Sequence, residues 1–528
     1  MKRVLVLVVL VLVGLLLFIP NMLLAASKDT LIITVPVPER KVVATYNPAF
    51  IDEGNGFWVG IYDTLIGLTP DLNPNIPLLA KSWEVSQDQK TVTLHLRKGV
   101  KFHDGTIFTA KDVKATIELV AHPKLANRIV NFLPPFTTLL GYEEFKAGKE
   151  KHIKGIEIID DYTIRFTHLK PNGTFFLGLA IVPIMPANKI EKLDPMYLAG
   201  DEYFKHPIGT GPYKLVEIKE GEYYKFEAFD EYWRGKPKIK YLIIRQIDPL
   251  LAVSKGEADF LCTYDINVVK AAQKSRKYEI LRASPARLQI FRFIPYAPPF
   301  DDIRFRRALI YAIDFDAIIK RFYGGYAKKM NTFMIPGYWE NKSLAPYEYD
   351  PEKAKKLVKE SGYDGRELEL LYYYSDSITP QILTAIQYYW KQVGINTKLR
   401  HVDGPTATAL VIGDLQEQFK GKGILYAANA AIDPSLLESF TTGHTWDFIK
   451  MNSKIYDEYV RKGYETLDPQ KRKEYYDLAQ SILYRESVPI PLWAPDIVNI
   501  KNKSLKIPID PFPGFWYPID LKLHEWEF

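Results

Sequence analysis

The sequence predicts an α/β protein with several lobes, and three observations support this prediction. The chain has 528 residues, which is too long for one hydrophobic core, so two or three lobes are expected. Hydrophobic residues make up 47% of the chain and charged residues 25%, as in folded globular proteins. Stretches with strand-like alternation are followed by stretches with helix-capping residues, which indicates that strands and helices are mixed along the chain.

The N-terminus predicts a secretory signal peptide over residues 1–26. A basic start is followed by the apolar run 4–19 and then by small residues at Ala25-Ala26-Ser27. An uncleaved membrane anchor is the alternative, because the apolar run is long and Leu24 is not small. No cysteine lies near Ala26, so a lipid-modified N-terminus is not expected. The mature chain is expected in the periplasm or another extracytoplasmic space.

The first elements of the mature chain are a strand and a helix. Residues 30–35 are rich in β-branched side chains and predict a strand. Residues 46–48, Tyr-Asn-Pro, follow, and the stretch 59–68 is interpreted as helix-like.

A strand, a turn and a helix are predicted over residues 91–113. Residues 91–97 alternate between apolar and polar side chains, the period of a half-buried strand. Asp104-Gly105 is a turn dipeptide, and Thr109 with Asp112 matches a helix capping box. His103 beside Asp104 also suggests a catalytic or metal site. The structural interpretation is preferred, because strand, turn and cap already account for these residues.

Further strands are predicted in two later stretches. Residues 153–169 are interpreted as two strands around an Asp160-Asp161 turn. Residues 208–246 are interpreted as a set of alternating strands with a break at Gly235-Lys236-Pro237.

Charge and cysteine content restrict the possible partners. The chain carries 69 Lys and Arg against 63 Asp and Glu, without a block of like charges, so no nucleic-acid partner is expected. Cys262 is the single cysteine, so no internal disulfide is possible.

The sequence contains no motif that identifies an enzyme or a metal site. Its nine histidines include no pair at the spacing of a metal-binding helix. It has neither a GxSxG nucleophile motif nor a P-loop. Gly209-Thr210-Gly211 is an incomplete phosphate-binding pattern and is interpreted as a turn. We expect no catalytic residue, metal or cofactor, and a secreted hydrolase with two facing carboxylates is a remote alternative.

Aromatic residues are abundant, at 13% of the chain with 34 Tyr and 9 Trp. Most are expected to pack in the core. Exposed aromatic faces suit apolar side chains and sugar rings alike, because both present C–H surface. The aromatic residues in loop-like contexts are Tyr46, Trp58, Trp339, Tyr373, Trp446 and Trp516.

The order of segments resembles the extracellular solute-binding proteins of family 5, which are the peptide- and nickel-type receptors of ABC importers. The resemblance covers nearly all of the mature chain. It rests on seven segments in the family's order: LLAKSWEVS (78–86), LRKGVKFHDGTIFTAKDV (96–113), GTGPYKLVEI (209–218), EYWRGKPKI (231–239), FDDIRFRRALIYAIDFDAII (300–319), YDPEKAKKLVKESGY (349–363) and SVPIPLW (487–493).

The resemblance implies a periplasmic-binding-protein-like fold of type II, cluster C. Two lobes that are discontinuous in sequence would clamp a ligand between them, and an additional α/β lobe would be attached. Lobe I would take residues 27–65, 183–280 and 486–528. The extra lobe II would take residues 66–182, and lobe III would take residues 281–485.

The resemblance also implies partners and a ligand. The chain would act as a monomer that carries a small-molecule ligand to ABC permease subunits, which work with a separate ATPase. In peptide-binding relatives an aspartate of a GW-x-x-D-x-x-D-P stretch holds the α-ammonium of the peptide. The matching stretch here is 426–434, in which Asp433-Pro434 is retained but Ala430 occupies the anchor position. Ile294 also stands where relatives often have Asn.

A peptide is therefore the main expectation, with Asn429 or Asp433 as substitute anchors. A short oligosaccharide is the alternative, because it suits the missing ammonium partner and the many aromatic residues. Metal chelates and other small solutes are further alternatives. The expected ligand-binding residues are Tyr46, Asn47, Trp58, Trp339, Tyr373, Asn429, Asp433 and Trp446.

Overall fold

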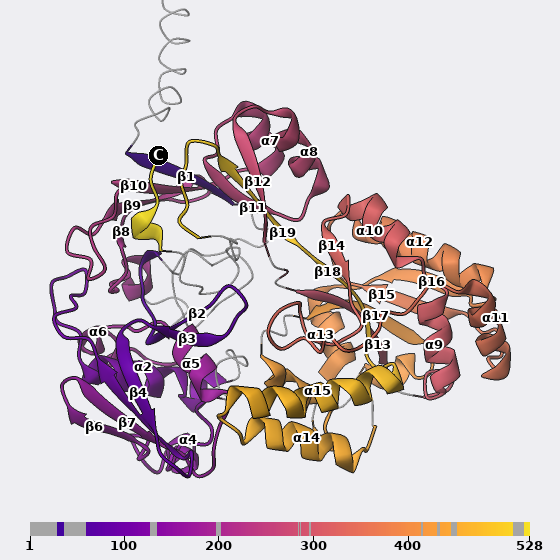
Figure 1. The fold of residues 1–528 in the computed structure, drawn as a ribbon, viewed down its shortest axis with the longest axis horizontal. Helices are drawn as coiled ribbons and strands as arrows, with labels where there is room; N and C mark the ends of the chain where they lie inside the picture. Colours follow the sequence, from indigo (N-terminus) through magenta and orange to yellow (C-terminus); the bar gives the residue numbers. More distant parts are fainter. Residues whose placement is uncertain are drawn as a thin grey trace, which may run out of the picture.

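The chain forms three lobes, each around its own main β-sheet (Figure 1). The structure is a computed structural model. It describes residues 29–35, 60–126, 135–196, 202–283, 285, 287–294, 297–412, 415–429, 433–444, 451–509 and 522–528.

Lobe I contains a seven-stranded sheet with the order β12-β19-β11-β1-β10-β9-β8. The strand β1 pairs in parallel with β10 and β11, and the other pairings are antiparallel. The strand predicted over residues 30–35 and the strands predicted over 208–246 are confirmed. The elements are β1 (Thr30–Val35), β8 (Tyr213–Lys219), β9 (Tyr223–Ala228), β10 (Tyr241–Gln246), β11 (Phe260–Thr263), β12 (Tyr278–Ala283), β19 (Ile497–Asn502), α7 (Pro249–Lys255), α8 (Ile266–Lys274), η3 (Glu202–Lys205) and η6 (Leu523–Glu525).

Lobe II contains a four-stranded antiparallel sheet with the order β4-β5-β7-β6 and a short β2-β3 pair. Helix α5 packs beside β2 and β3, and α2 packs beside β6 and α6. The elements are β2 (Ile66–Leu68), β3 (Pro74–Pro77), β4 (Ala80–Val85), β5 (Thr91–Leu96), β6 (Ile156–Asp160), β7 (Thr163–Thr167), α2 (Ala110–Val120), α3 (Pro123–Ala126), α4 (Tyr142–Lys146), α5 (Phe175–Ile181) and α6 (Ala187–Ile190).

The strand, turn and helix predicted over residues 91–113 are confirmed. Strand β5 alternates between half-buried and buried residues. Gly105 has φ +86 in the turn, where a side chain would be strained. Thr109 and Asp112 form both hydrogen bonds of a capping box at the start of α2. The hairpin of β6 and β7 around residues 160–163 is confirmed as well.

The helix predicted over residues 59–68 is wrong. Residues 66–68 form the strand β2, and Thr64 makes an isolated β-bridge with Pro183. The reason is that a short apolar run does not distinguish a buried helix from a strand buried on both faces. Every residue from 60 to 68 is buried.

Lobes I and II are joined through buried polar groups rather than through an open linker. The Nε2 atom of His103 lies 2.9 Å from the Gly211 carbonyl oxygen, and the His103 amide donates to the Gly209 carbonyl at 2.9 Å. Burial lowers the pKa of His103 to about 4. The Asp63 carboxylate accepts hydrogen bonds from Thr210, Tyr232 and Trp233, while burial raises its pKa to about 6.

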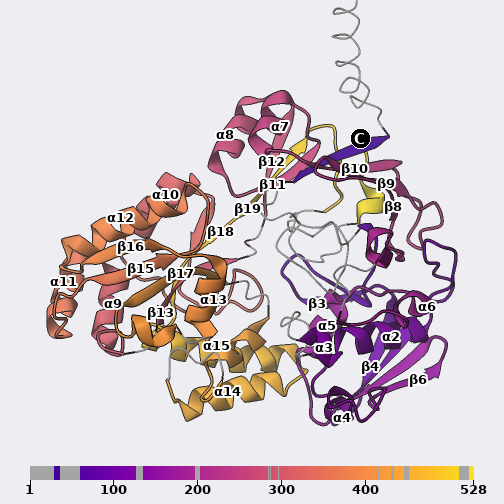
Figure 2. The same ribbon diagram turned by 180° about the vertical axis from the view of Figure 1, so that it is seen from behind.

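Lobe III contains a six-stranded sheet with the order β14-β18-β13-β17-β15-β16 (Figure 2). The strand β15 runs parallel to β16 and β17. The strands are β13 (Leu288–Ile294), β14 (Ala327–Lys329), β15 (Leu368–Tyr372), β16 (Thr397–His401), β17 (Gly423–Asn429) and β18 (Ile490–Pro495). The helices are α9 (Ile303–Tyr311), α10 (Phe315–Tyr323), α11 (Pro351–Glu360), α12 (Thr379–Gln392), α13 (Gly404–Ile412), η4 (Gln416–Phe419), η5 (Pro434–Phe440), α14 (Lys454–Tyr464) and α15 (Pro469–Glu486).

The chain enters lobe III between β12 and β13 and leaves it between β18 and β19. Asp496 is the one residue between β18 and β19, so strand pairing places this crossing later than the boundary expected at residue 486. Asp496 is buried and forms an ion pair with Arg282, which also donates to the Gly325 carbonyl oxygen at 3.0 Å. Short crossings of this kind can act as a hinge.

Candidate ligand-binding site

The carboxyl ends of the parallel strands in lobes I and III face the same crossing. In lobe I, Thr263 at the end of β11 pairs with Val498, just after Asp496. In lobe III, Asn429 at the end of β17 pairs with Leu288, where β13 begins. Because ligands of open α/β sheets bind outside the carboxyl ends of the strands, the region between these two edges is the candidate site for the ligand, and we refer to it as the cleft.

Two arginines lie at the lobe III side of this cleft. Arg287 precedes β13, and its guanidinium carbon lies 4.4 Å from the centre of the Tyr264 ring in lobe I. Arg292 lies on β13 itself. Burial lowers the pKa of Arg292 to about 10, and the neighbouring Tyr373 and Tyr374 act in the opposite direction. Arg292 therefore remains a cation at neutral pH, so this edge carries positive charge.

Tyrosines surround the positive edge. Tyr373 and Tyr374 follow β15, and their rings stack with centroids 4.5 Å apart. The Tyr374 ring lies 5.7 Å from the ring of Tyr426 on β17. Burial raises the pKa of Tyr426 and of Tyr323, so both keep neutral hydroxyl groups. The edge thus combines guanidinium donors with aromatic faces and hydroxyl groups.

Of the expected binding residues, Tyr373 and Asn429 lie at this edge. Tyr373 directly follows β15, and Asn429 is the last residue of β17. Tyr46, Asn47, Trp58 and Trp446 lie outside the described residues.

Asp433 is engaged inside lobe III. Its two carboxylate oxygens accept hydrogen bonds from the guanidinium of Arg472 at 2.9 and 2.8 Å. One of these oxygens also accepts from the Ser435 amide and caps η5. Both side chains of the ion pair are buried. This geometry accounts for Asp433 as a structural residue that pairs with Arg472 inside lobe III.

Trp339 is also enclosed by neighbours. Its side chain is 5% exposed. The Tyr338 and Tyr476 rings lie edge-on to it, and the Arg472 guanidinium carbon is 4.8 Å from its ring centre. A platform for a sugar needs an accessible ring face, which Trp339 does not present in this conformation.

Sequence reasoning missed Arg287 and Arg292. A single arginine in or beside a strand is ordinarily a solvated residue, so neither position carried a signal. The available cue was a mainly apolar stretch, 288–294, which Arg287 precedes and which contains Arg292. The pairing that brings them toward Tyr264, Tyr373 and Tyr374 is a tertiary feature.

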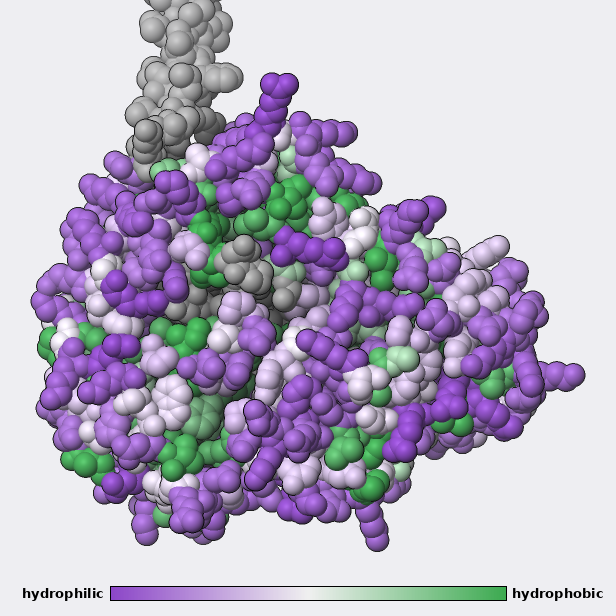
Figure 3. Space-filling model, in the orientation of Figure 1, coloured by the Kyte–Doolittle hydropathy of each residue, from purple (hydrophilic) through white to green (hydrophobic). Residues whose placement is uncertain are grey.

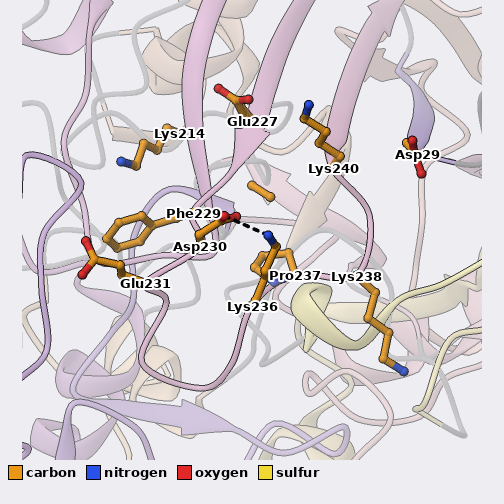
Figure 4. Close-up of a pocket in the computed structure, with 11 residues that line it drawn as sticks. Asp29, Lys214, Glu227, Phe229, Asp230, Glu231, Lys236, Pro237, Lys238 and Lys240 are labelled. Atoms are coloured by element: carbon orange, nitrogen blue, oxygen red, sulfur yellow. Dashed lines mark hydrogen bonds and ion pairs between the residues drawn. The ribbon is translucent and has the colours of Figure 1, made fainter.

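A hollow lies on lobe I and is lined mainly by charged residues (Figure 4). It encloses about 640 Å³ beside β8, β9 and the 229–240 loop. Its charges are mixed: Lys236 pairs with Asp230 at 2.8 Å, and Lys214 lies over the Phe229 ring.

On the face shown in Figure 3, hydrophobic residues form several small groups within a mainly hydrophilic surface.

The described residues contain neither a metal-binding cluster nor a membrane span. They include no group of three or more His, Cys, Asp or Glu side chains placed to hold an ion. Helices in this part of the chain are also too short or too polar to cross a bilayer.

Comparison with known proteins assigns the family. The profile of the bacterial extracellular solute-binding proteins, family 5 (middle region), matches residues 75–477. The glutathione-binding protein GsiB of Escherichia coli O1:K1 is 30% identical over 473 residues, which covers 86% of each chain.

Solved structures agree with this assignment. CtaP, an ABC transporter substrate-binding protein from Listeria monocytogenes, has 26% identity and a TM-score of 0.80, covering 94% of this chain and 99% of its own. NikZ from Campylobacter jejuni, in complex with Ni(L-His), has 25% identity and a TM-score of 0.77, covering 95% and 100%. The expected type II periplasmic-binding-protein fold is confirmed. This chain belongs to the bacterial extracellular solute-binding proteins of family 5 and is a binding protein rather than an enzyme.

Proposed function

We propose that this chain is the extracytoplasmic substrate-binding component of an ABC importer and that it captures a short peptide between lobes I and III. Family membership supports the receptor role. The partners would be permease subunits in the membrane, driven by a separate ATPase. The receptor would act as a monomer, and closure of lobe III onto lobe I would create the form that the permease recognises.

The observation that supports a peptide is the positive and tyrosine-rich edge of lobe III. Arg287 and Arg292 provide planar donors that suit a carboxylate, and every linear peptide ends in one. Glutathione, the ligand named for the Escherichia coli relative, is a tripeptide with two carboxylates. Backbone hydrogen bonds to the ligand would add affinity that is independent of its side chains.

The carboxylate is expected to contribute more than the ammonium. Asp433, the nearest acid to the lost anchor, already accepts from Arg472. The oligosaccharide alternative gains no support from Trp339, which is buried, or from the relatives described above.

Calorimetric titration of residues 27–528 tests the proposal. The probes are reduced glutathione, short peptides with free or amidated C-termini, maltotriose and Ni(L-His). We expect a peptide to bind and its amidated form to bind at least tenfold more weakly, about 1.4 kcal/mol. Arg287→Gln should reproduce most of this loss. Arg366→Gln is the matched control, because Arg366 precedes β15 at the opposite end of the strand and pairs with Asp364. Binding of maltotriose or Ni(L-His) alone would contradict the peptide assignment.

Export is part of the proposal. We expect the signal peptide to be removed near residue 26, since the basic start, apolar run and small residues are in the order that signal peptidase recognises. N-terminal sequencing of the protein from its native envelope measures this directly. An intact Met1 on membrane-bound material would instead support an anchor.

A further inference from the structure

Lobe II touches lobe III at a place remote from the chain crossings. In both ribbon views the ends of α14 and α15 that approach lobe II lie far below the crossing between β18 and β19 (Figures 1 and 2). The contact involves Gln89 and residues 170–173 of lobe II, which we term the lobe II rim. They meet the α14–α15 turn, residues 464–468 of lobe III.

Polar interactions join the two surfaces, among them three that involve Gly173, Gln89 and Lys170. The Gly173 amide donates to the Tyr464 carbonyl oxygen at 2.7 Å. The Leu467 amide donates to the Gln89 side-chain oxygen at 2.9 Å. The Lys170 ammonium forms an ion pair with Glu465 at 3.0 Å. All three cross from one lobe to the other, so all three are lost if the lobes separate here.

Gly173 permits this close approach. A β-carbon at residue 173 would lie 2.6 Å from the Arg472 Nε atom and 2.6 Å from the Thr466 carbonyl oxygen. Both atoms belong to lobe III, and one is backbone. The φ of Gly173 lies outside the left-handed region. Glycine is therefore required by the neighbouring lobe and not by the conformation of its own backbone.

Both surfaces are shaped within their own lobes. In the lobe II rim, Asn172 accepts from the Thr174 amide at 2.9 Å and donates to the Pro135 carbonyl oxygen at 3.1 Å. In lobe III, Arg472 is held beneath the turn by the buried carboxylate of Asp433. Each surface can therefore keep its shape when the two are apart.

We propose that the lobe II rim and the α14–α15 turn form a latch that holds the binding cleft closed. Lobe III is connected to lobe I through the crossing at Asp496, so opening the cleft rotates lobe III about that region. Residues on the far side of lobe III travel furthest in such a rotation. Interactions that exist only in the closed form shift the equilibrium toward it. The extra lobe would thus set how readily the cleft opens.

Gly173→Ala is the decisive variant, because its methyl group is a wedge only in the closed form. Lys170→Ala removes the ion pair with Glu465 and the contact of its ammonium with the Tyr464 ring, and Gln89→Ala removes one hydrogen bond. Neither adds a wedge, and they serve if Gly173→Ala does not fold. Arg165→Ala is the matched control for Lys170→Ala, because it breaks the exposed ion pair with Glu157 inside lobe II.

Opening is measured on the protein without added ligand by electron–electron resonance between two spin labels. Cys262→Ser removes the native thiol, and Lys151→Cys in lobe II and Lys356→Cys in α11 carry the labels, since both lysines are exposed. We expect Gly173→Ala to lower the closed population at least tenfold, with smaller shifts for Lys170→Ala and Gln89→Ala. Arg165→Ala should leave the distance distribution unchanged.

Two results would overturn the latch. In the first, the latch variants give the same distance distribution as the parent. The contact would then persist during opening and act as a pivot. In the second, the parent is already fully open without ligand. Neither result depends on the identity of the ligand, so failure of the latch is distinct from failure of the peptide assignment.

Discussion

At the residue scale, His103 shows how burial converts an apparent catalytic residue into a structural one. Its imidazole contacts the Gly209–Gly211 backbone and holds lobe II to lobe I. The low pKa of about 4 follows from burial, which disfavours the charged ring. His103 therefore stays neutral at physiological pH, as a structural hydrogen-bonding group requires.

This pKa predicts an acid-sensitive junction. Between the unfolded value of about 6.5 and the folded value of about 4, the unfolded chain binds more protons, so stability falls as the pH falls. The full contribution is present above pH 6.5 and amounts to at most about 3 kcal/mol. In His103→Gln, the unfolding free energy should fall less steeply as the pH is lowered between these two values. Urea denaturation at a series of pH values measures this.

Comparing His103→Gln with the parent separates the effect of His103 from that of groups whose contribution to stability changes with pH in the opposite direction. Burial raises the pKa of Asp63 to about 6, so its contribution declines as the pH rises from 3.8 through 6. His206→Gln, at an exposed position, controls for the loss of one histidine. An unchanged slope in His103→Gln would contradict the prediction.

The buried pair of Asp433 and Arg472 makes a second prediction at this scale. Asp433→Asn leaves the Arg472 cation buried without its charge partner, which should cost about 3–5 kcal/mol of unfolding free energy. Adding Arg472→Met should recover part of this loss, because no buried charge then remains. A large loss of peptide affinity with normal stability would instead place Asp433 on the ligand.

At the element scale, α2 shows that local sequence starts a helix and that a tertiary contact then forms at the same N-terminal end. Thr109 and Asp112 satisfy each other's backbone amides in the capping box. The same Asp112 carboxylate reaches the Ala187 amide at 2.8 Å and ties α6 to α2. The segment 102–112 thus belongs to the scaffold of lobe II and to its junction with lobe I.

We predict that Thr109→Ala costs about 1 kcal/mol of unfolding free energy through the lost cap, while ligand affinity stays unchanged. Thr106→Ala is the control, because the Thr106 hydroxyl reaches only Asp104 in the exposed turn, and its effect should stay within about 0.5 kcal/mol. A loss of affinity in Thr109→Ala without a loss of stability would contradict a scaffold role.

At the scale of the whole molecule, the ligand should couple the two clamp lobes. A ligand that binds the folded chain alone stabilises it by about 2.7 kcal/mol at a hundred times its Kd. We expect the peptide that binds most tightly in the titration to raise the unfolding free energy by this amount. Denaturation with and without that peptide measures it, and the amidated peptide at equal concentration should give a smaller shift.

The sequence by itself determined the α/β class and several elements of this protein. The strand at residues 91–96, the capped helix after Thr109 and the hairpin around residues 160–163 rest on neighbouring residues, because alternation, turn chemistry and caps act over a few positions. The ordered segments also identified the family. The helix predicted over residues 59–68 was wrong, because a segment that is buried on all sides has no periodic pattern that separates strand from helix.

Only the tertiary structure decided how the charged residues are used. Asp433 resembled a ligand anchor until the fold placed Arg472 against it from α15, 39 residues away. Arg287 and Arg292 became site candidates only because strand pairing places the carboxyl ends of both sheets beside the crossing at Asp496. Gly173 acquired its role from Thr466 and Arg472 of another lobe. A charge or a glycine takes its role from the groups that pack against it, and distant segments supply those groups.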